Sequence, residues 1–99
     1  MAQYDLFRDP AGKGFLLDVQ SDLLEALNVR AVVPLLPETT APTAASRLNP
    51  TFDIGGETHV MMTQFISAVP AAILKAPAGD LSANFDTVTA ALDMLFHGF

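Results

Sequence analysis

The side chains that could carry acid–base, nucleophilic or metal chemistry are few and scattered in this sequence. His59 and His97 are 38 residues apart and the chain has no cysteine. Neither a His-Glu-x-x-His helix nor a cysteine-rich metal site can therefore be built. The serines lack the Gly-x-Ser-x-Gly setting of a hydrolase nucleophile and have no histidine close by in sequence. These patterns predict a protein that is not an enzyme and that uses neither a metal ion nor a cofactor.

Two short motifs with possible chemistry are better explained as turns. Asp18 ends an expected strand and Asp22 begins a turn. The two could form an acid–base pair, but we favour capping or hydrogen bonds to backbone amides of the turn. The Gly12–Gly14 stretch, GKG, resembles part of a phosphate-binding loop. The loop pattern also requires glycine where the chain has Phe7 and serine or threonine where it has Gly14, so we predict a turn.

Composition predicts one small domain, residues 1–99, that binds other proteins. Hydrophobic residues make up 51% of the chain and charged residues 16%. A chain of this size has much surface for its volume, so part of the apolar surface is expected in a subunit interface. Five dispersed basic residues and a net charge of −6 disfavour direct nucleic-acid binding. An acidic surface instead suits a basic partner.

The sequence contains neither a secretion signal nor a membrane span that we can identify. Its first residues include Asp5 and Asp9 and lack the basic-then-apolar order of a signal peptide. Proline, arginine or polar residues interrupt each apolar stretch before the roughly 18 residues that a span requires. We expect a soluble cytoplasmic protein.

The first half of the chain is expected to form strands joined by turns. Pro34 lies within an apolar run and should confine that strand to a sheet edge or a bulge. The proline-rich stretch 37–50 predicts a long connection that is either functional or a plain linker. The expected elements are strands at 4–7 and 15–20, a short helical turn or bulged edge at 21–28 and a strand at 30–36.

A hairpin is predicted over residues 51–62, TFDIGGETHVMM. A two-residue glycine loop would place its apolar residues on opposite faces, because side chains alternate along a strand. We therefore predict a three-residue loop, residues 55–57, that pairs Phe52 with Val60. This register puts His59 beside Asp53 on the outer face, where the pair is either a simple surface contact or a functional site.

The last third predicts a strand at 65–74, broken at Pro70, a loop, and a helix that begins at an N-cap, Ser82. Asp86 would lie near the positive end of the helix dipole. An apolar stripe should face the sheet, and a polar side with Asp86, Asp93 and His97 should face solvent. Because the stripe continues to the last residue, we expect its last turn to lie against something. The stripe comprises Phe85, Val88, Leu92, Leu95, Phe96 and Phe99.

Three stretches in this order and at these spacings resemble the CcdB family of plasmid and chromosomal toxins. They are FLLDVQSDLLEALNVRAVVPL, then HVMMTQFISAVPAAIL, then DLS followed by ALDMLFHGF. The similarity covers nearly the whole chain and fades only in residues 37–50 and in the first hairpin turn. The combination of DVQSDLL with a final helix that ends in Phe-x-Gly and an apolar residue is specific to this family.

The resemblance implies a mainly β fold with one C-terminal α-helix, an SH3-like barrel of the CcdB/MazF type that forms a homodimer. It also implies a toxin that binds the DNA gyrase A subunit and traps the cleaved-DNA complex. A CcdA-like antitoxin would neutralise the toxin and, together with it, repress their operon, and such a pair would serve plasmid maintenance. Family positions implied to contact gyrase are Leu23, Leu24, Asp93, Phe96, His97, Gly98 and Phe99. Leu23 and Asp93 are implied to contact the antitoxin as well.

The chain departs from the family pattern at three of these positions. His97 stands where the family has tryptophan, Phe99 replaces a smaller aliphatic residue, and Asp93 replaces an amide. Losing a tryptophan at a buried hot spot costs about 1–3 kcal/mol of binding free energy. Two alternatives therefore stay open: a non-toxic CcdB-like decoy that binds antitoxin, and a MazF-like endoribonuclease. The dispersed bases and the acidic net charge disfavour the ribonuclease.

Overall fold

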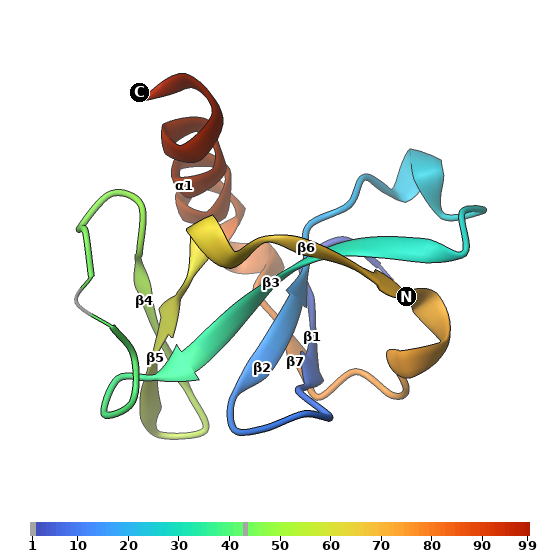
Figure 1. Cartoon of the computed structure of the whole chain (residues 1–99), viewed down its shortest axis with the longest axis horizontal. Helices are drawn as coiled ribbons and strands as arrows, with labels where there is room; N and C mark the ends of the chain where they lie inside the picture. Colours follow the sequence, from blue (N-terminus) through green and yellow to red (C-terminus); the bar gives the residue numbers. More distant parts are fainter. Residues whose placement is uncertain (1, 43) are drawn as a thin grey trace.

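The computed structural model describes residues 2–42 and 44–99 and shows a curled antiparallel sheet with one long helix packed on it (Figure 1). The strand order is β4-β5-β3-β2-β1-β7, and β6 pairs with β3 beside β5. The predicted mainly β architecture with a C-terminal helix is confirmed. The strands are β1 (Asp5–Arg8), β2 (Phe15–Asp18), β3 (Val29–Pro37), β4 (Thr51–Ile54), β5 (Glu57–Met61), β6 (Ser67–Pro70) and β7 (Gly79–Asp80). The helices are α1 (Phe85–His97) and the 3₁₀ turns η1 (Asp22–Leu24), η2 (Thr63–Phe65), η3 (Ala71–Ile73) and η4 (Ser82–Asn84).

Strand β3 is central, and two different strands share one of its edges. β2 pairs along one edge, while β6 pairs with the first half of the other edge and β5 with its end. The Pro34 carbonyl accepts a hydrogen bond from the Met62 N–H at 2.9 Å. Because the nitrogen and carbonyl of one strand residue face the same neighbour, the proline nitrogen faces the gap between β6 and β5. The edge alternative predicted for Pro34 is therefore wrong: the proline lies in a central strand, at the point where the partner of that strand changes from β6 to β5.

The predicted first hairpin and its turn are confirmed. β1 pairs with β2 in antiparallel register, and the Asp9 side chain accepts the Ala11 N–H inside the turn. Gly14 has a φ of 96° and passes against β3, so a Cβ there would lie 2.1 Å from the Leu35 carbonyl oxygen. Glycine is therefore required at position 14 by both conformation and space.

We expect Gly14→Ala to lower the free energy of unfolding by at least about 1–3 kcal/mol, the usual cost of a strained backbone position. The displaced β3 backbone would add to this cost. Gly12→Ala is the matched control, because a Cβ at that position meets nothing within 4 Å. Urea unfolding of the two variants measures the difference. Equal midpoints would show that the turn yields without strain.

The β4–β5 hairpin has a different register from the predicted one. Phe52 lies opposite His59 and Ile54 opposite Glu57, which leaves a two-residue loop. Gly55 and Gly56 both have positive φ, 62° and 84°, as a mirror-image two-residue turn requires. The predicted three-residue loop is wrong, because two glycines form the tighter turn at no steric cost.

This register turns His59 into the core. Its ring packs edge-on against Phe15, with the ring centroids 5.1 Å apart, and its Nδ1 lies 3.0 Å from the Glu57 carbonyl oxygen. Asp53 is exposed on the other face. The predicted surface pair of His59 and Asp53 is therefore wrong. Val60 and Met61 are both buried, so β5 lacks the polar alternation on which the sequence argument relied.

Helix α1 packs on the sheet through fewer residues than predicted. Val88 and Ala91 are fully buried and Leu92 packs against the same core. The predicted stripe is right for Val88 and Leu92, and Leu95 is half-buried. It is wrong for three phenylalanines, whose exposed fractions are 52% for Phe85, 63% for Phe96 and 77% for Phe99. A helix meets a curved sheet along a narrow line, and here small Ala91 occupies that line.

The start of the helix also differs from the prediction. Ser82 lies in η4, where its N–H and hydroxyl both donate to the Asp80 carboxylate. The residue before α1 is Asn84, which makes no side-chain capping hydrogen bond. Asp86 lies in the first turn, as predicted. Ser82 is therefore not the N-cap of α1, because it lies in η4, three residues before the helix begins.

The long connection after β3 is confirmed, and its second part is fixed to the fold. Asn49 is buried, accepts the Ala45 N–H and donates to the Met61 carbonyl, each at 3.0 Å. Residues 45–48 thereby lie beside Met94 and Leu95, around a mainly apolar hollow of about 430 Å³. Thr43, which belongs to this connection, lies outside the described residues. Later in the chain, the strand predicted over 65–74 is shorter: β6 ends at Pro70, the predicted break, and η3 replaces the strand expected after it.

Candidate functional site

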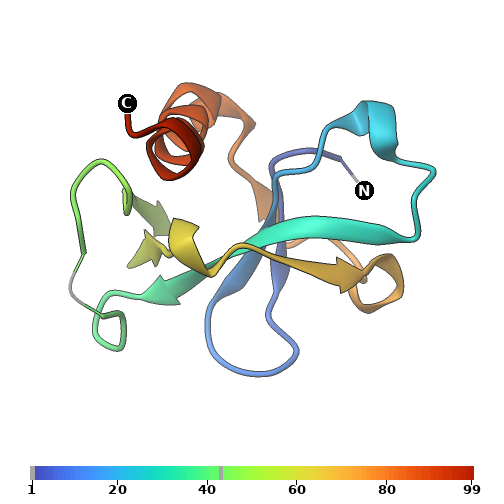
Figure 2. The same ribbon diagram turned by 45° about the horizontal axis from the view of Figure 1, so that its top comes forward.

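Two apolar segments project from the same side of the β3–β6 ladder without joining the core. The first, the leucine turn, is residues 21–28 and contains η1. The second, the aromatic tip, is residues 96–99 at the end of α1. Figure 1 shows them above the sheet at opposite ends, and Figure 2 shows both still at the top after the view is turned. The predicted site residues therefore fall into two groups on one side of the protomer, which the fold keeps apart.

The leucine turn displays apolar side chains and buries none of its residues. Leu23 is 94% exposed and Leu24 48% exposed. The short helical turn predicted here is confirmed. Its N-cap is Ser21, whose side chain accepts the Leu23 N–H at 3.2 Å. Two adjacent leucines in water, unsupported by core contacts, form an apolar patch available to another protein.

A buried ion pair contacts the backbone of Gln20, the residue that precedes this turn. The Arg30 Nη2 is 2.7 Å from the Asp18 Oδ2, and both side chains are almost completely buried. Asp18 also accepts the Gln20 N–H at 3.0 Å. Burial raises the pKa of Asp18, while the hydrogen bonds from Arg30 and Gln20 and the Arg30 charge act in the opposite direction. The Arg30 charge and hydrogen bonds therefore offset the cost of burying the ionised Asp18 carboxylate.

The structural interpretation is confirmed for Asp18, which accepts a backbone amide of the turn, whereas Asp22 accepts an amide from outside the turn. Asp18 holds Arg30 and a backbone amide, and Asp22 accepts the Gln3 N–H at 2.8 Å. Sequence reasoning missed the role of Arg30, which was counted only as one of the dispersed bases. A signal was present: Arg30 alternates with Val32 on the same strand, so both side chains point to one face.

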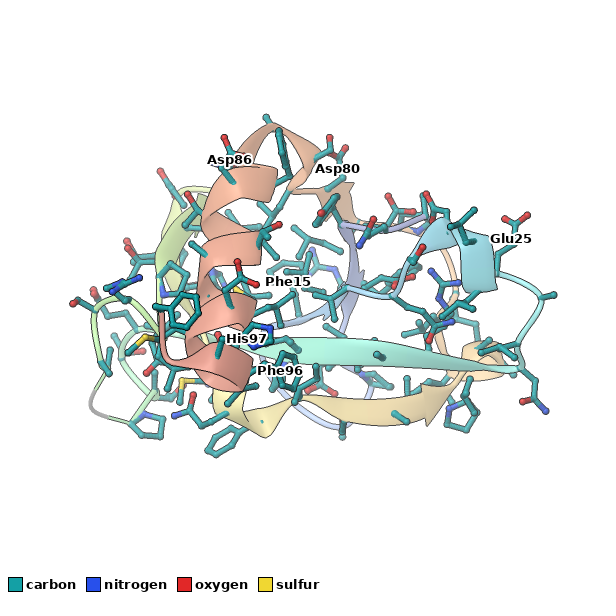
Figure 3. All side chains as sticks on the ribbon, turned by 90° about the horizontal axis from the view of Figure 1, so that it is seen from above. Phe15, Glu25, Asp80, Asp86, Phe96 and His97 are labelled. Carbon is teal, nitrogen blue, oxygen red and sulfur yellow. The ribbon has the colours of Figure 1, made fainter. Side chains whose placement is uncertain are left out.

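The aromatic tip begins where α1 ends. Gly98 has a φ of 80°, and its N–H is shared by the Asp93 and Met94 carbonyls, which closes the helix. The His97 and Phe99 ring centroids are 6.1 Å apart and tilted. Figure 3 shows Phe96 and His97 on the last turn of the helix, and both side chains are exposed. Asp93, one turn earlier, is exposed as well, so this end of the helix offers aromatic rings beside one carboxylate.

A third surface feature, a hollow of about 620 Å³, lies near the β1–β2 and β4–β5 turns. Charges of both signs line it, from Arg8, Lys13 and Glu57 among others, and Phe15 and His59 contribute aromatic surface. Arg8 stacks over the Phe15 ring at 5.4 Å. Sequence reasoning did not predict this hollow, because it depends on the hairpin register. Among residues 2–42 and 44–99, no three histidine, cysteine, aspartate or glutamate side chains gather as a metal site would require.

Within the part of the chain that the structure describes, no helix has the length and apolar character needed to cross a membrane.

A comparison with known protein families finds a match over nearly the whole chain. The profile of the family described as CcdB protein matches residues 3–98. This match includes both the leucine turn and nearly all of the aromatic tip. The chain therefore belongs to the CcdB family, the toxins of type II toxin–antitoxin systems.

Proposed function

We propose that this protein poisons DNA gyrase by binding its A subunit through the leucine turn and the aromatic tip. The observation that carries the proposal is the exposure of apolar side chains at the family's implied contact positions. Leu23 and Phe99 are 94% and 77% exposed. Burying such side chains in a partner contributes about 1.5–3 kcal/mol each, which an isolated protomer forgoes. The two segments supply the apolar anchors from which protein interfaces draw most of their energy.

The proposed mechanism is selective binding and involves no reaction catalysed by the toxin. A ligand that binds one state of an enzyme more tightly shifts the population to that state. The toxin would bind the gyrase complex in which DNA is cleaved and so prevent resealing. Leu23, Leu24, Asp93, Phe96, His97, Gly98 and Phe99 are the proposed gyrase contacts.

The proposed assembly is a homodimer, in which two protomers bring two sets of segments together. A protomer with exposed phenylalanines and 51% hydrophobic residues has apolar surface to cover. A CcdA-like antitoxin is proposed to overlap the gyrase surface at Leu23 and Asp93. The net charge of −6 favours a basic antitoxin segment. With that antitoxin the toxin would repress its own operon in the cytoplasm.

The first test is a cleavage assay with purified protein, host gyrase, ATP and supercoiled plasmid. After detergent and protease, linear DNA is expected, and added antitoxin should remove it. An absence of linear DNA, with active gyrase and folded dimeric toxin, would contradict poisoning. That outcome would instead support an antitoxin-binding decoy, for which His97 in place of the family's tryptophan is the specific observation.

We expect Leu23→Ser to weaken gyrase binding at least about thirtyfold, the effect of losing a hot-spot side chain worth about 2 kcal/mol. Folding should be unaffected, because the side chain is 94% exposed. Binding kinetics with the gyrase A subunit and a thermal melt measure both properties. Ile73→Ser, a partly exposed apolar side chain in η3, is the matched control. Equal affinity of the two variants would remove the leucine turn from the interface.

A further inference from the structure

The shape of the leucine turn is held by hydrogen bonds, since none of its residues is buried. Within the turn, Leu24, Glu25 and Leu27 donate to carbonyls three residues earlier. Two hydrogen bonds from other parts of the chain reach its flanks, from the Gln3 N–H to the Asp22 side chain and from the Ala71 N–H to the Asn28 carbonyl. A connection with so few buried contacts belongs to the least stable part of a fold. These two hydrogen bonds hold Asp22 and Asn28, so the segment between them needs a further contact if Leu23 and Leu24 are to be presented in one geometry.

The Gln20 side chain makes three hydrogen bonds that join the two ends of this connection. Its Nε2 donates to the Leu24 carbonyl inside the turn and to the Val29 carbonyl at the start of β3, each at 3.2 Å. Its Oε1 accepts the Ala31 N–H at 3.0 Å. All three donor and acceptor bonds come from one neutral side chain, and they span residues 20 to 31.

Gln20 also continues the β2–β3 ladder beyond its last backbone pair. Asp18 and Val32 form that last pair, and the Val19 N–H then donates to the Ala31 carbonyl at 3.1 Å. The Ala31 N–H faces the same side, where no further β2 backbone acceptor is paired with it. The Gln20 amide oxygen is the acceptor for this N–H, so one side chain hydrogen-bonds both to the end of the sheet and to the turn.

The buried ion pair fixes the backbone from which Gln20 extends. Asp18 accepts the Gln20 N–H, and the Arg30 Nη2 lies 3.5 Å from the Gln20 carbonyl oxygen. The backbone amide and carbonyl of Gln20 therefore both contact the Asp18–Arg30 pair. The Gln20 side chain therefore extends from a buried, hydrogen-bonded backbone toward the leucine turn, which has no buried residues.

We propose that Gln20 is the positioning residue of the leucine turn. It sets the fraction of molecules in which Leu23 and Leu24 have the binding geometry. This role rests on the proposed gyrase contact of the turn. A side chain that restricts a loop raises the fraction of molecules in the binding geometry, and apparent affinity scales with that fraction. Gln20 itself need not touch gyrase.

The test compares the wild-type protein with Gln20→Ala, Gln20→Glu and a control, Thr40→Ala. Glutamate keeps an acceptor for Ala31 but loses both donors, so it should leave the turn loose. Thr40 is the control because its hydroxyl also donates to a backbone carbonyl, that of Pro37. It lies in the connection after β3, away from the leucine turn in the sequence. Backbone ¹⁵N order parameters of residues 21–28, rate constants for binding the gyrase A subunit, and melting temperatures are measured for each.

We expect Gln20→Ala and Gln20→Glu to lower the order parameters of the leucine turn below about 0.6, from the roughly 0.85 of rigid backbone. If a tenth of the molecules keep the binding geometry, the association rate constant falls about tenfold with little change in dissociation. Thr40→Ala should match wild type. Unchanged order parameters in Gln20→Ala would overturn the proposal, as would a lower melting temperature with an unchanged association rate.

The order parameters separate this role from the proposed function. If the turn loosens in Gln20→Ala but the wild-type protein does not bind gyrase, the positioning role is supported and gyrase poisoning is contradicted. If the turn stays rigid in Gln20→Ala and the wild-type protein binds gyrase, only the positioning role is contradicted.

Discussion

Deleting Gly98 and Phe99 is expected to abolish gyrase poisoning while the protein stays folded. Phe99 is 77% exposed, and Gly98 contributes only the closing hydrogen bonds of α1. The buried anchors of the helix, Val88 and Ala91, lie two or more turns earlier. Losing a hot-spot aromatic costs 2 kcal/mol or more, so affinity should fall at least about thirtyfold. The cleavage assay and gyrase binding measure the loss, and circular dichroism checks folding.

Two variants separate the aromatic ring from the helix end. Phe99→Ala keeps the Gly98 cap and should reproduce most of the loss. Phe85→Ala removes an equally apolar, half-exposed ring from the first turn of the same helix and should leave poisoning intact. An unfolded deletion variant would show that residues 98 and 99 support the fold. Full activity of Phe99→Ala would remove this residue from the proposed interface.

The largest effect on stability is expected at the buried ion pair. Asp18→Ala would leave the Arg30 guanidinium buried without its carboxylate, which costs about 3–5 kcal/mol. That is a large share of the roughly 5–15 kcal/mol by which a domain is stable. Urea unfolding should therefore show a strongly reduced midpoint or an unfolded variant. Asp22→Ala is the control, since Asp22 accepts one exposed backbone amide and its loss should cost well under half as much.

A double variant distinguishes an unpaired charge from lost packing. Asp18→Leu with Arg30→Met replaces both partners by apolar side chains and should restore most of the stability that Asp18→Ala loses. If the double variant were as unstable as the single one, the site would depend on its hydrogen bonds to Gln20 more than on charge pairing. Stability of Asp18→Ala equal to wild type would contradict the buried pair itself.

Most of the local elements, and the family, could be predicted from the sequence. Local signals carried these predictions: a Pro/Gly/Asp turn between two apolar runs, a short helical pattern in residues 21–28, and an apolar period in residues 85–99 that predicted the helix but not which phenylalanines it buries. The family rests on DVQSDLL and on the terminal helix motif, and the match over residues 3–98 confirms it. The predicted site residues are still a proposal, but the exposed turn on which Leu23 and Leu24 lie was correctly predicted to be a short helical turn.

The neighbours of each element could not be predicted from the sequence, because they depend on tertiary packing. Pro34 lies in a central strand because β6 and β5 share one edge of β3, a pairing that no local pattern encodes. His59 is buried because two glycines formed the tighter turn and Phe15 supplied a packing partner. The Asp18–Arg30 pair and the Gln20 bonds join residues up to 12 apart through a sheet register. Sequence periodicity reports one element at a time, whereas these contacts depend on how elements pack against one another.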